Sequence, residues 1–394
     1  MSAFVLLCSL VLVDAEFVKT LLDCGESAWE QFCDETTPPE QDLEMFADLA
    51  DKLARLLPRQ LLRENVADSL LPQSGETVRL EGNVIFVTKY DGKMPMYRCQ
   101  MELNSGGTAG VFVPSIPQAW EQNVPIQERA ALFGIYIKSY EDTPLFAAPA
   151  IEWYPNTWLG NLGFNVASFD QVPVCRVTEL EQHDEETNRR IFKFTESDVE
   201  PFYGLFRAIS ATSEGWLEAE AKKQQANEAI GVTDLFNRPG ETRGKPVLLH
   251  GVVKRVVSTP VTDSAVQSLF GIDHYYQMFL YTQHSRGNPI VVCVRSLPEG
   301  MPIGDADHFS ESITVAAVPY KLWIYETPEG AHYAPLLIGR QPAWHPKPAW
   351  QRQAPAAFAS FSFAAFFALA LIWFACRLWA RKTFRAFTSS CVYF

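Results

Sequence analysis

The chain contains the pattern Gly-x-x-Val-x-Leu-x-Gly-x-Val twice, and the second copy begins 169 residues after the first. An internal repeat fixes an architecture before any single residue is interpreted, so we expect one β-domain in two copies. The number of residues between matched positions grows along the chain, which indicates longer loops in the second copy. The matched pairs are Gly75/Gly244, Val78/Val247, Leu80/Leu249, Gly82/Gly251, Val84/Val253, Gln100-Met101/Gln277-Met278, Ser115-Ile116-Pro117/Ser296-Leu297-Pro298, Lys138/Lys321 and Ala148-Pro149/Ala334-Pro335.

Each copy holds about five short apolar runs separated by Gly, Pro and Asp turns, a pattern typical of a small Greek-key barrel. The repeated glycine at 82 and 251 has a physical reason, because a first strand that serves both sides of a barrel must bend sharply. We therefore predict OB-like β-domains over residues 74–155 and 241–346.

Helical patterns surround the β-domains. Apolar residues recur at threes and fours after residue 42, and the same spacing returns after residue 197. We predict a helical N-terminal segment over 16–73 and a helical connector over 156–240. Glu44, Phe46 and Leu49 are matched by Glu200, Phe202 and Leu205 at an offset of 156, which suggests that a helix belongs to the repeat.

The two ends of the chain resemble membrane-targeting segments. Ala357–Cys376 carries no charge over 20 residues and is followed by Arg377, Arg381, Lys382 and Arg385. This favours a transmembrane helix over 356–376 with a basic cytoplasmic tail over 377–394, and a Pro-rich stalk over 347–355 before it. The alternative is a buried core helix. The expected fold class is thus α+β: two OB-like small β-barrels joined by helical segments, plus one C-terminal transmembrane helix.

The orientation set by the basic tail requires an export signal. Ala3–Val13 is apolar and is followed by small residues at Val13 and Ala15, so we predict a signal peptide over 1–15. A buried first helix is the alternative. With the signal, the body of the protein lies outside the cytoplasm, on the outer side of a cell membrane.

The net charge of the 394 residues is −13. A surface so acidic repels phosphate backbones, and we therefore expect no nucleic acid among the partners.

The repeat pattern at the start of a five-strand module resembles an OB-fold-type domain. The wider layout resembles uncharacterised bacterial membrane-anchored proteins, through Leu159–Gly163, Phe169-Asp170, Phe202–Leu205 and Tyr333–Leu337. The resemblance implies a fold and a place in the bacterial envelope but no activity, so it supplies no functional residues. The chain departs from that group in two ways: no Lys or Arg precedes the first apolar run, and Pro260–Asp273 is a long insert.

Aromatic residues form the strongest ligand-binding pattern. OB barrels often bind ligands on the face of strands two and three, where aromatic rings stack bases or sugars. We predict such a site, for a glycan or a peptide, although half of an alternating set belongs in a core. Its candidate residues are Tyr275, Tyr276, Tyr281, Trp323 and Tyr325.

Two further patterns are possible sites. Asp305, Asp307 and Glu311 could converge on a metal ion such as Ca²⁺, with a polar turn as the alternative reading. Cys24 and Cys33 lie nine residues apart and could form a disulfide.

The chain has no nucleophile elbow, metalloprotease helix, phosphate-binding loop or paired Cys-x-x-Cys, so we predict no catalytic residue and no cofactor. The function we expect is a non-enzymatic binding or scaffolding module of the cell envelope, anchored by a single span, with an envelope protein or a glycan as partner. The alternatives are an envelope enzyme that uses Asp305, Asp307 and Glu311 on a glycan or peptide, and a structural spacer.

Overall fold

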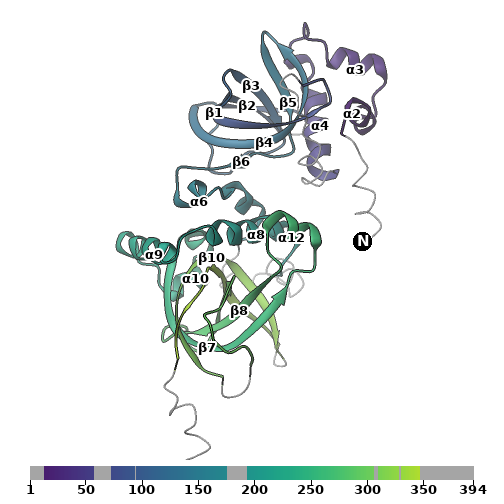
Figure 1. Cartoon of the computed structure of the whole chain (residues 1–394). Helices are drawn as coiled ribbons and strands as arrows, with labels where there is room; N and C mark the ends of the chain where they lie inside the picture. Colours follow the sequence, from purple (N-terminus) through teal and green to yellow (C-terminus); the bar gives the residue numbers. More distant parts are fainter. Residues whose placement is uncertain are drawn as a thin grey trace, which may run out of the picture.

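The computed structural model describes residues 13–56, 72–93, 95–174, 193–305, 309–327 and 330–346 (Figure 1). Within these ranges the chain is α+β, with helices that precede and cover two six-stranded sheets. None of the helices in the described ranges is long and apolar enough to cross a membrane. The predicted stalk, transmembrane helix and tail over 347–394, and residues 1–12 of the predicted signal peptide, lie outside the described residues.

Both sheets close into a barrel with the strand order of an OB fold. In the first, the order is β1-β2-β3-β5-β4, β1 also pairs with β4, and β3 runs parallel to β5. The second repeats this order, with the parallel pair formed by β9 and β11. The strands are β1 (Thr77–Asp91), β2 (Pro95–Leu103), β3 (Thr108–Val113), β4 (Pro125–Tyr140), β5 (Thr143–Ala147), β6 (Glu152–Trp153), β7 (Val247–Pro260), β8 (His274–Tyr281), β9 (Ile290–Val294), β10 (Glu311–Thr327), β11 (Gly330–Gly339) and β12 (Ala343–His345).

The predicted duplication is confirmed in local detail. A Cβ on Gly82 would collide with the carbonyl oxygen of Glu102, and a Cβ on Gly251 would collide with that of Tyr281. Just beyond each glycine the pairing of the first strand shifts register, between Val84 and Phe86 in one copy and between Val253 and Arg255 in the other. The glycine thus allows close strand approach at the bend, in both barrels.

Helices cover the outer side of each barrel. They are α2 (Ala15–Leu22), α3 (Glu26–Phe32), η1 (Pro39–Gln41), α4 (Leu43–Leu56), α6 (Trp158–Asn161), η2 (Val166–Gln171), α8 (Glu196–Ser210), α9 (Trp216–Asn227), α10 (Val232–Asn237), α11 (Pro239–Thr242) and α12 (Ser264–Phe270). Phe46 of α4 stacks on Phe112 of β3 at a centroid distance of 4.0 Å. Phe202, its equivalent in α8, packs edge-on against Tyr275 and Tyr320, both at 5.6 Å. The repeat therefore includes a helix as well as a barrel.

A buried ion pair ties each helix to its own barrel. Lys138 Nζ lies 2.6 Å from the Asp42 carboxylate, and Lys321 Nζ lies 2.9 Å from that of Asp198. The two aspartates are separated by the same 156 residues as the helix matches. Each lysine follows a register shift in the fourth strand, which turns its side chain toward the helix. We call each helix with its barrel a unit.

The start of the described chain belongs to the first unit. Asp14 caps α2 by accepting a hydrogen bond from the Phe17 backbone N–H at 2.9 Å, and Val13 is 4% exposed in the core beneath the helices. A cut after Ala15 would remove both contacts, so the structure gives no support to the predicted cleavage point.

The described part of the segment between the barrels packs onto the second unit and lies between the two barrels (Figure 1). The half-buried Arg243 guanidinium donates hydrogen bonds to the carbonyl oxygens of Tyr320 at 2.7 Å, Phe169 at 3.0 Å and Val172 at 3.1 Å. Burial lowers the pKa of Arg243 to about 10. From the other side, Arg129 of the first unit donates to the Gly160 carbonyl at 2.6 Å. The described part of the connector is therefore held by hydrogen bonds to both units.

Candidate functional site

The structure divides the five predicted aromatic residues between different environments. Tyr275 is 8% exposed and packs under α8, where burial raises its pKa, so it is a core residue. Tyr276 points the other way and packs against the barrel interior. Tyr281, Trp323 and Tyr325 are half-buried and share the outer surface of the second barrel. Successive side chains of a strand alternate between its two faces, so the expectation that half of the aromatic set belongs to a core applies to Tyr275 and Tyr276.

Two connections of the second barrel are longer than their counterparts in the first, one because of its loop and the other because of its paired strands. In the first barrel, three residues separate the paired residues Asp91 and Pro95, whereas thirteen separate Pro260 and His274. The thirteen include α12, which packs on α8. These are the loops between strands one and two, which together with those between strands four and five border the ligand face of OB folds.

The hairpin between strands four and five shows the same asymmetry. Tyr140 and Thr143, with two residues between them, are the last pair of the first hairpin. The equivalent pair of the second hairpin, Trp323 and Ala334, is followed by four more pairs that end at Thr327 and Gly330. Because both connections lengthen, two predicted repeat matches are out of register, and the observed strand pairings correct them. These are Gln100-Met101/Gln277-Met278 and Ala148-Pro149/Ala334-Pro335.

A group of rings that we call the aromatic face lies on β8 and the longer hairpin. It consists of Tyr281 of β8, of Trp323, Tyr325 and His332 of the hairpin, and of Phe279 of β8, which is buried at 8% exposure. Trp323 and Tyr325 lie 6.0 Å apart with planes inclined by 25°, and Tyr325 and His332 lie 5.7 Å apart at 27°. Phe279 meets Tyr325 edge-on at 5.8 Å. Burial, and then the neighbouring Tyr281, raise the pKa of Tyr325. The candidates from the sequence did not include Phe279 or His332, and the position of His332 depends on the hairpin pairing.

Exposed cations border the aromatic face. Lys254 Nζ lies 4.7 Å from the centroid of the Tyr281 ring, and the Arg255 guanidinium lies 5.3 Å from that of Phe279. At the positions equivalent to Phe279 and Tyr281 the first barrel has Gln100 and Glu102. This combination of rings and cations therefore belongs to the second barrel.

Of the three predicted metal ligands, the two in the described residues contact other side chains. Asp305 lies 3.8 Å from Arg255, and Glu311 accepts a hydrogen bond from the Trp344 indole N–H at 2.7 Å. The first barrel holds Glu128 and Trp153 in the same contact at 2.7 Å, which marks the Glu311 contact as part of the repeated fold. Asp307 lies outside the described residues.

The predicted bridge between Cys24 and Cys33 is not formed. Both thiols are free and partly buried among the N-terminal helices, and burial raises the pKa of both. Thiols that hold their protons near neutral pH are poor nucleophiles.

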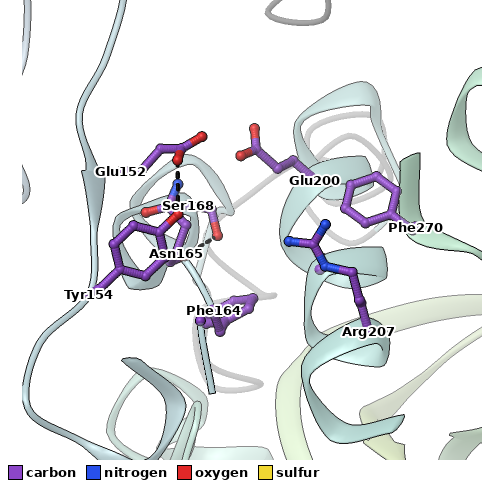
Figure 2. Close-up of a pocket in the computed structure, with 10 residues that line it drawn as sticks. Glu152, Tyr154, Phe164, Asn165, Ser168, Glu200, Arg207 and Phe270 are labelled. Atoms are coloured by element: carbon purple, nitrogen blue, oxygen red, sulfur yellow. Dashed lines mark hydrogen bonds between the residues drawn. The ribbon is translucent and has the colours of Figure 1, made fainter. Parts of the chain in front are cut away.

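A cleft lies between the two units (Figure 2). Glu152, at 7% exposure, accepts a hydrogen bond from the Tyr154 hydroxyl at 2.8 Å on the first unit's side. Glu200 and Arg207 of α8 form the opposite wall, and the Arg207 guanidinium lies 5.7 Å from the centre of the Phe270 ring. The residues that line it are Glu152, Tyr154, Gly163, Phe164, Asn165, Ser168, Glu200, Gly204, Arg207 and Phe270.

The cleft is small. It leaves about 30 Å³ for the centres of water-sized atoms. One water needs about 10–15 Å³ by this measure, so the cleft holds two or three such groups. Pockets for drug-sized ligands are about ten times larger or more, roughly 300–1,000 Å³. A glycan or peptide substrate therefore does not fit it.

No protein-family model matches the chain, and no curated protein matches it. Among solved structures, it is similar to the mitochondrial single-stranded DNA-binding protein Rim1 from S. cerevisiae. The identity is 14%, the match covers 26% of this chain and 96% of that chain, and the TM-score is 0.17. A score this low assigns no ligand to this chain.

The prediction that nucleic acid is excluded is corrected, because its argument from the net charge of the whole chain does not hold for the second barrel. The error has a physical cause. Residues 14–153 hold 23 acidic and 11 basic side chains, whereas residues 245–345 hold eight and seven. Charges beyond about 10 Å are largely screened at physiological salt, so the net charge of −13 does not describe the second barrel.

Proposed function

We propose that this protein is a non-enzymatic binding module of two OB-like units, in which the second unit holds a ligand on the aromatic face. The ligand we propose is an extended polymer that presents flat rings together with negative charge. The observation that carries the proposal is the longer β10–β11 hairpin, which adds Tyr325 and His332 to a region where OB barrels hold ligands.

The chemistry of the aromatic face supports this ligand class. Each base stacked on an aromatic side chain contributes about 1–3 kcal/mol, and stacking tolerates many ring types. Lys254 and Arg255 supply positive charge beside the rings, where anionic groups of the ligand would lie. The first unit has Gln100 and Glu102 in place of Phe279 and Tyr281 and, in this proposal, serves as the rigid base.

We also propose that the uncharged segment 356–376 tethers the module to a bacterial cell membrane, with both units on the extracytoplasmic side. This rests on the sequence, because the segment lies outside the described residues. A tether raises the effective concentration of weak contacts. The enzyme alternative relied on Asp305, Asp307 and Glu311, and the contacts of Asp305 with Arg255 and of Glu311 with Trp344 favour a structural role.

The test is a fluorescence titration of the full chain at fixed low salt with a single-stranded oligonucleotide, an acidic oligosaccharide and a neutral oligosaccharide. We expect one of the two anionic polymers to bind. Trp323→Ala should lower the affinity for that polymer about tenfold, because it removes one stacked ring. Lys254→Gln should lower the affinity for the same ligand. It should also reduce the magnitude of the slope of log affinity against log salt by about one.

The matched control is Tyr140→Ala, at the position of the first barrel equivalent to Trp323, which should leave binding unchanged. The proposal is refuted if neither anionic polymer binds, or if Tyr140→Ala and Trp323→Ala weaken binding equally.

A further inference from the structure

We propose that the second barrel binds a cupric ion between His250 and His345. The site is separate from the aromatic face and does not depend on the proposed function. It lies where three neighbouring strands run side by side, in the order β7, β10 and β12. His250 belongs to β7 and His345 to β12, and Thr314 of β10 lies between them.

The two imidazole rings approach the same hydroxyl group. His250 Nδ1 lies 2.8 Å from Thr314 Oγ1, and His345 Nε2 lies 3.0 Å from the same oxygen. His250 is directly opposite Thr314 in the strand pairing, and His345 is opposite Ser312, two residues away on β10. Because Ile313, next to Thr314, packs inside the barrel, the Thr314 hydroxyl and both rings share the outer surface.

Both rings can turn toward one metal ion. The two nitrogens lie within about 6 Å of each other, and an ion about 2 Å from each requires a separation of about 3–4 Å. His250 and His345 are both exposed to solvent, so rotation about their side-chain bonds can close this difference without moving the core.

The hydrogen bonds to Thr314 do not prevent coordination. The hydroxyl has one proton and donates to only one ring at a time. A neutral imidazole can carry its proton on either nitrogen, so His250 Nδ1 and His345 Nε2 can both present a lone pair to the ion.

The set of donor atoms favours Cu²⁺. Among the described residues, no three His, Cys, Asp or Glu side chains gather in a way that could hold a metal ion, so the four protein ligands of a structural zinc site are not present there. Oxygen from Thr314 or from water would complete a site of two imidazoles. Tetragonal sets of nitrogen and oxygen donors are typical of Cu²⁺ and Ni²⁺, and Cu²⁺ binds most tightly of the divalent first-row ions.

The first barrel does not repeat this arrangement. At the three equivalent positions it has Glu81, Ala131 and Tyr154. The proposed site therefore belongs to the second barrel, and β6, the equivalent of β12, serves as an internal reference.

Copper would fasten β12 to the barrel. β12 pairs with β10 over three residues, from Ala343 to His345, and coordination would join it to β7 across β10. Amide hydrogen exchange in β12 should therefore slow when copper binds, whereas exchange in β6 should not change.

The experiment is a titration of the full chain with CuCl₂ in a buffer that does not bind copper. Isothermal titration calorimetry should show one equivalent bound with a Kd below about 10 µM. Electron paramagnetic resonance should show the coupling of two coordinated imidazole nitrogens. Zn²⁺, titrated in the same way, should bind about tenfold more weakly or less. Hydrogen exchange followed by mass spectrometry compares the peptides that contain β12 and β6.

Two variants remove one ligand each. His250→Asn and His345→Asn should each weaken copper binding about tenfold or more and abolish the signal of two imidazoles. Both should fold, because the rings are exposed. The matched control is His284→Asn, which removes an exposed histidine from the turn after β8 and should leave affinity and spectrum unchanged.

The proposal is overturned if copper binds with a Kd above about 100 µM, or if the spectrum shows a single coordinated imidazole. An equal loss of affinity in His284→Asn and His250→Asn would also overturn it, because copper would then bind to scattered surface histidines. Zn²⁺ that binds as tightly as Cu²⁺ would contradict the assignment of the metal.

Discussion

Replacing Asp198 with asparagine tests whether the buried lysine of the second unit depends on its carboxylate partner. The side chains of Lys321 and Asp198 are 1% and 0% exposed, and Lys321 Nζ donates to both carboxylate oxygens at 2.9 Å. Burial lowers the pKa of Lys321, and Asp198 opposes that lowering. Asparagine keeps an oxygen for the Tyr320 hydroxyl but removes the charge, which leaves the ammonium group with the Lys193 carbonyl.

We expect the free energy of unfolding to fall by about 3–5 kcal/mol at neutral pH, because a buried charge loses its counter-charge. The loss has a ceiling, since Lys321 can release its proton on folding. That release costs about 1.4 kcal/mol for each pH unit below the unfolded pKa of about 10.4, or about 4.6 kcal/mol at pH 7.

The same reasoning fixes the sign of the pH dependence. The folded pKa of Lys321 lies below the unfolded value, so the unfolded chain binds more protons in the interval between them. Stability therefore rises with pH in that interval. The Asp198→Asn variant should regain up to about 1.4 kcal/mol per pH unit between about pH 7 and pH 10.

Urea unfolding followed by far-UV circular dichroism, repeated across that pH range, measures this. Asp42→Asn is the matched control in the first unit. It should cost less, because Lys138 also donates to the carbonyl oxygens of Asp34 at 3.1 Å and Thr37 at 3.0 Å. The double variant Asp198→Asn/Lys321→Met should recover most of the loss. A loss that does not change with pH, or a double variant as unstable as the single one, would refute the reasoning.

Three further changes test other contacts by the same unfolding measurement. Gly251→Ala should destabilise the chain by about 1–3 kcal/mol, because its Cβ would meet the Tyr281 carbonyl oxygen, and an unchanged midpoint would argue against a close strand approach. Arg243→Met should cost about 3 kcal/mol by leaving backbone carbonyls without a donor, and a loss below about 1 kcal/mol would contradict this. Asp14→Ala should cost about 1 kcal/mol by removing the cap of α2, whereas Asp14→Asn should be nearly neutral.

The barrels could be predicted from the sequence because the repeat carries the residues that bend the first strand. Gly82 and Gly251 lie where only a glycine fits, and the apolar alternation around them is typical of strands. The register of later strands could not be predicted in the same way. Two-residue matches such as Ala148-Pro149 arise by chance when the loops between copies differ in length.

The sequence contained enough information to predict the buried ion pairs, but they were not predicted. Lys138 and Lys321 had been matched between the copies, each within an apolar strand, where an unpaired lysine is costly. Asp42 and Asp198 lie two residues before the first matched pair of the helix, at the same offset. A matched charge in an apolar strand, with a matched opposite charge elsewhere, is a usable signal of a buried pair.

The cleft could not be predicted. Its lining comes from β6, the connector, α8 and α12, so no local pattern brings the residues together. The aromatic face depends in a similar way on a hairpin register that becomes apparent only from the strand pairing.

The order of the paired residues along the chain also determines when each ion pair can form during synthesis on the ribosome. Asp42 precedes Lys138 by 96 residues, and Asp198 precedes Lys321 by 123. At translation rates of about 5–20 residues per second, each helix waits roughly 5–25 s before the strand that receives its carboxylate has been made. During that interval the ring of Phe46, and later that of Phe202, has no barrel to cover it. Chaperones that hold nascent chains would meet this protein twice, once for each unit.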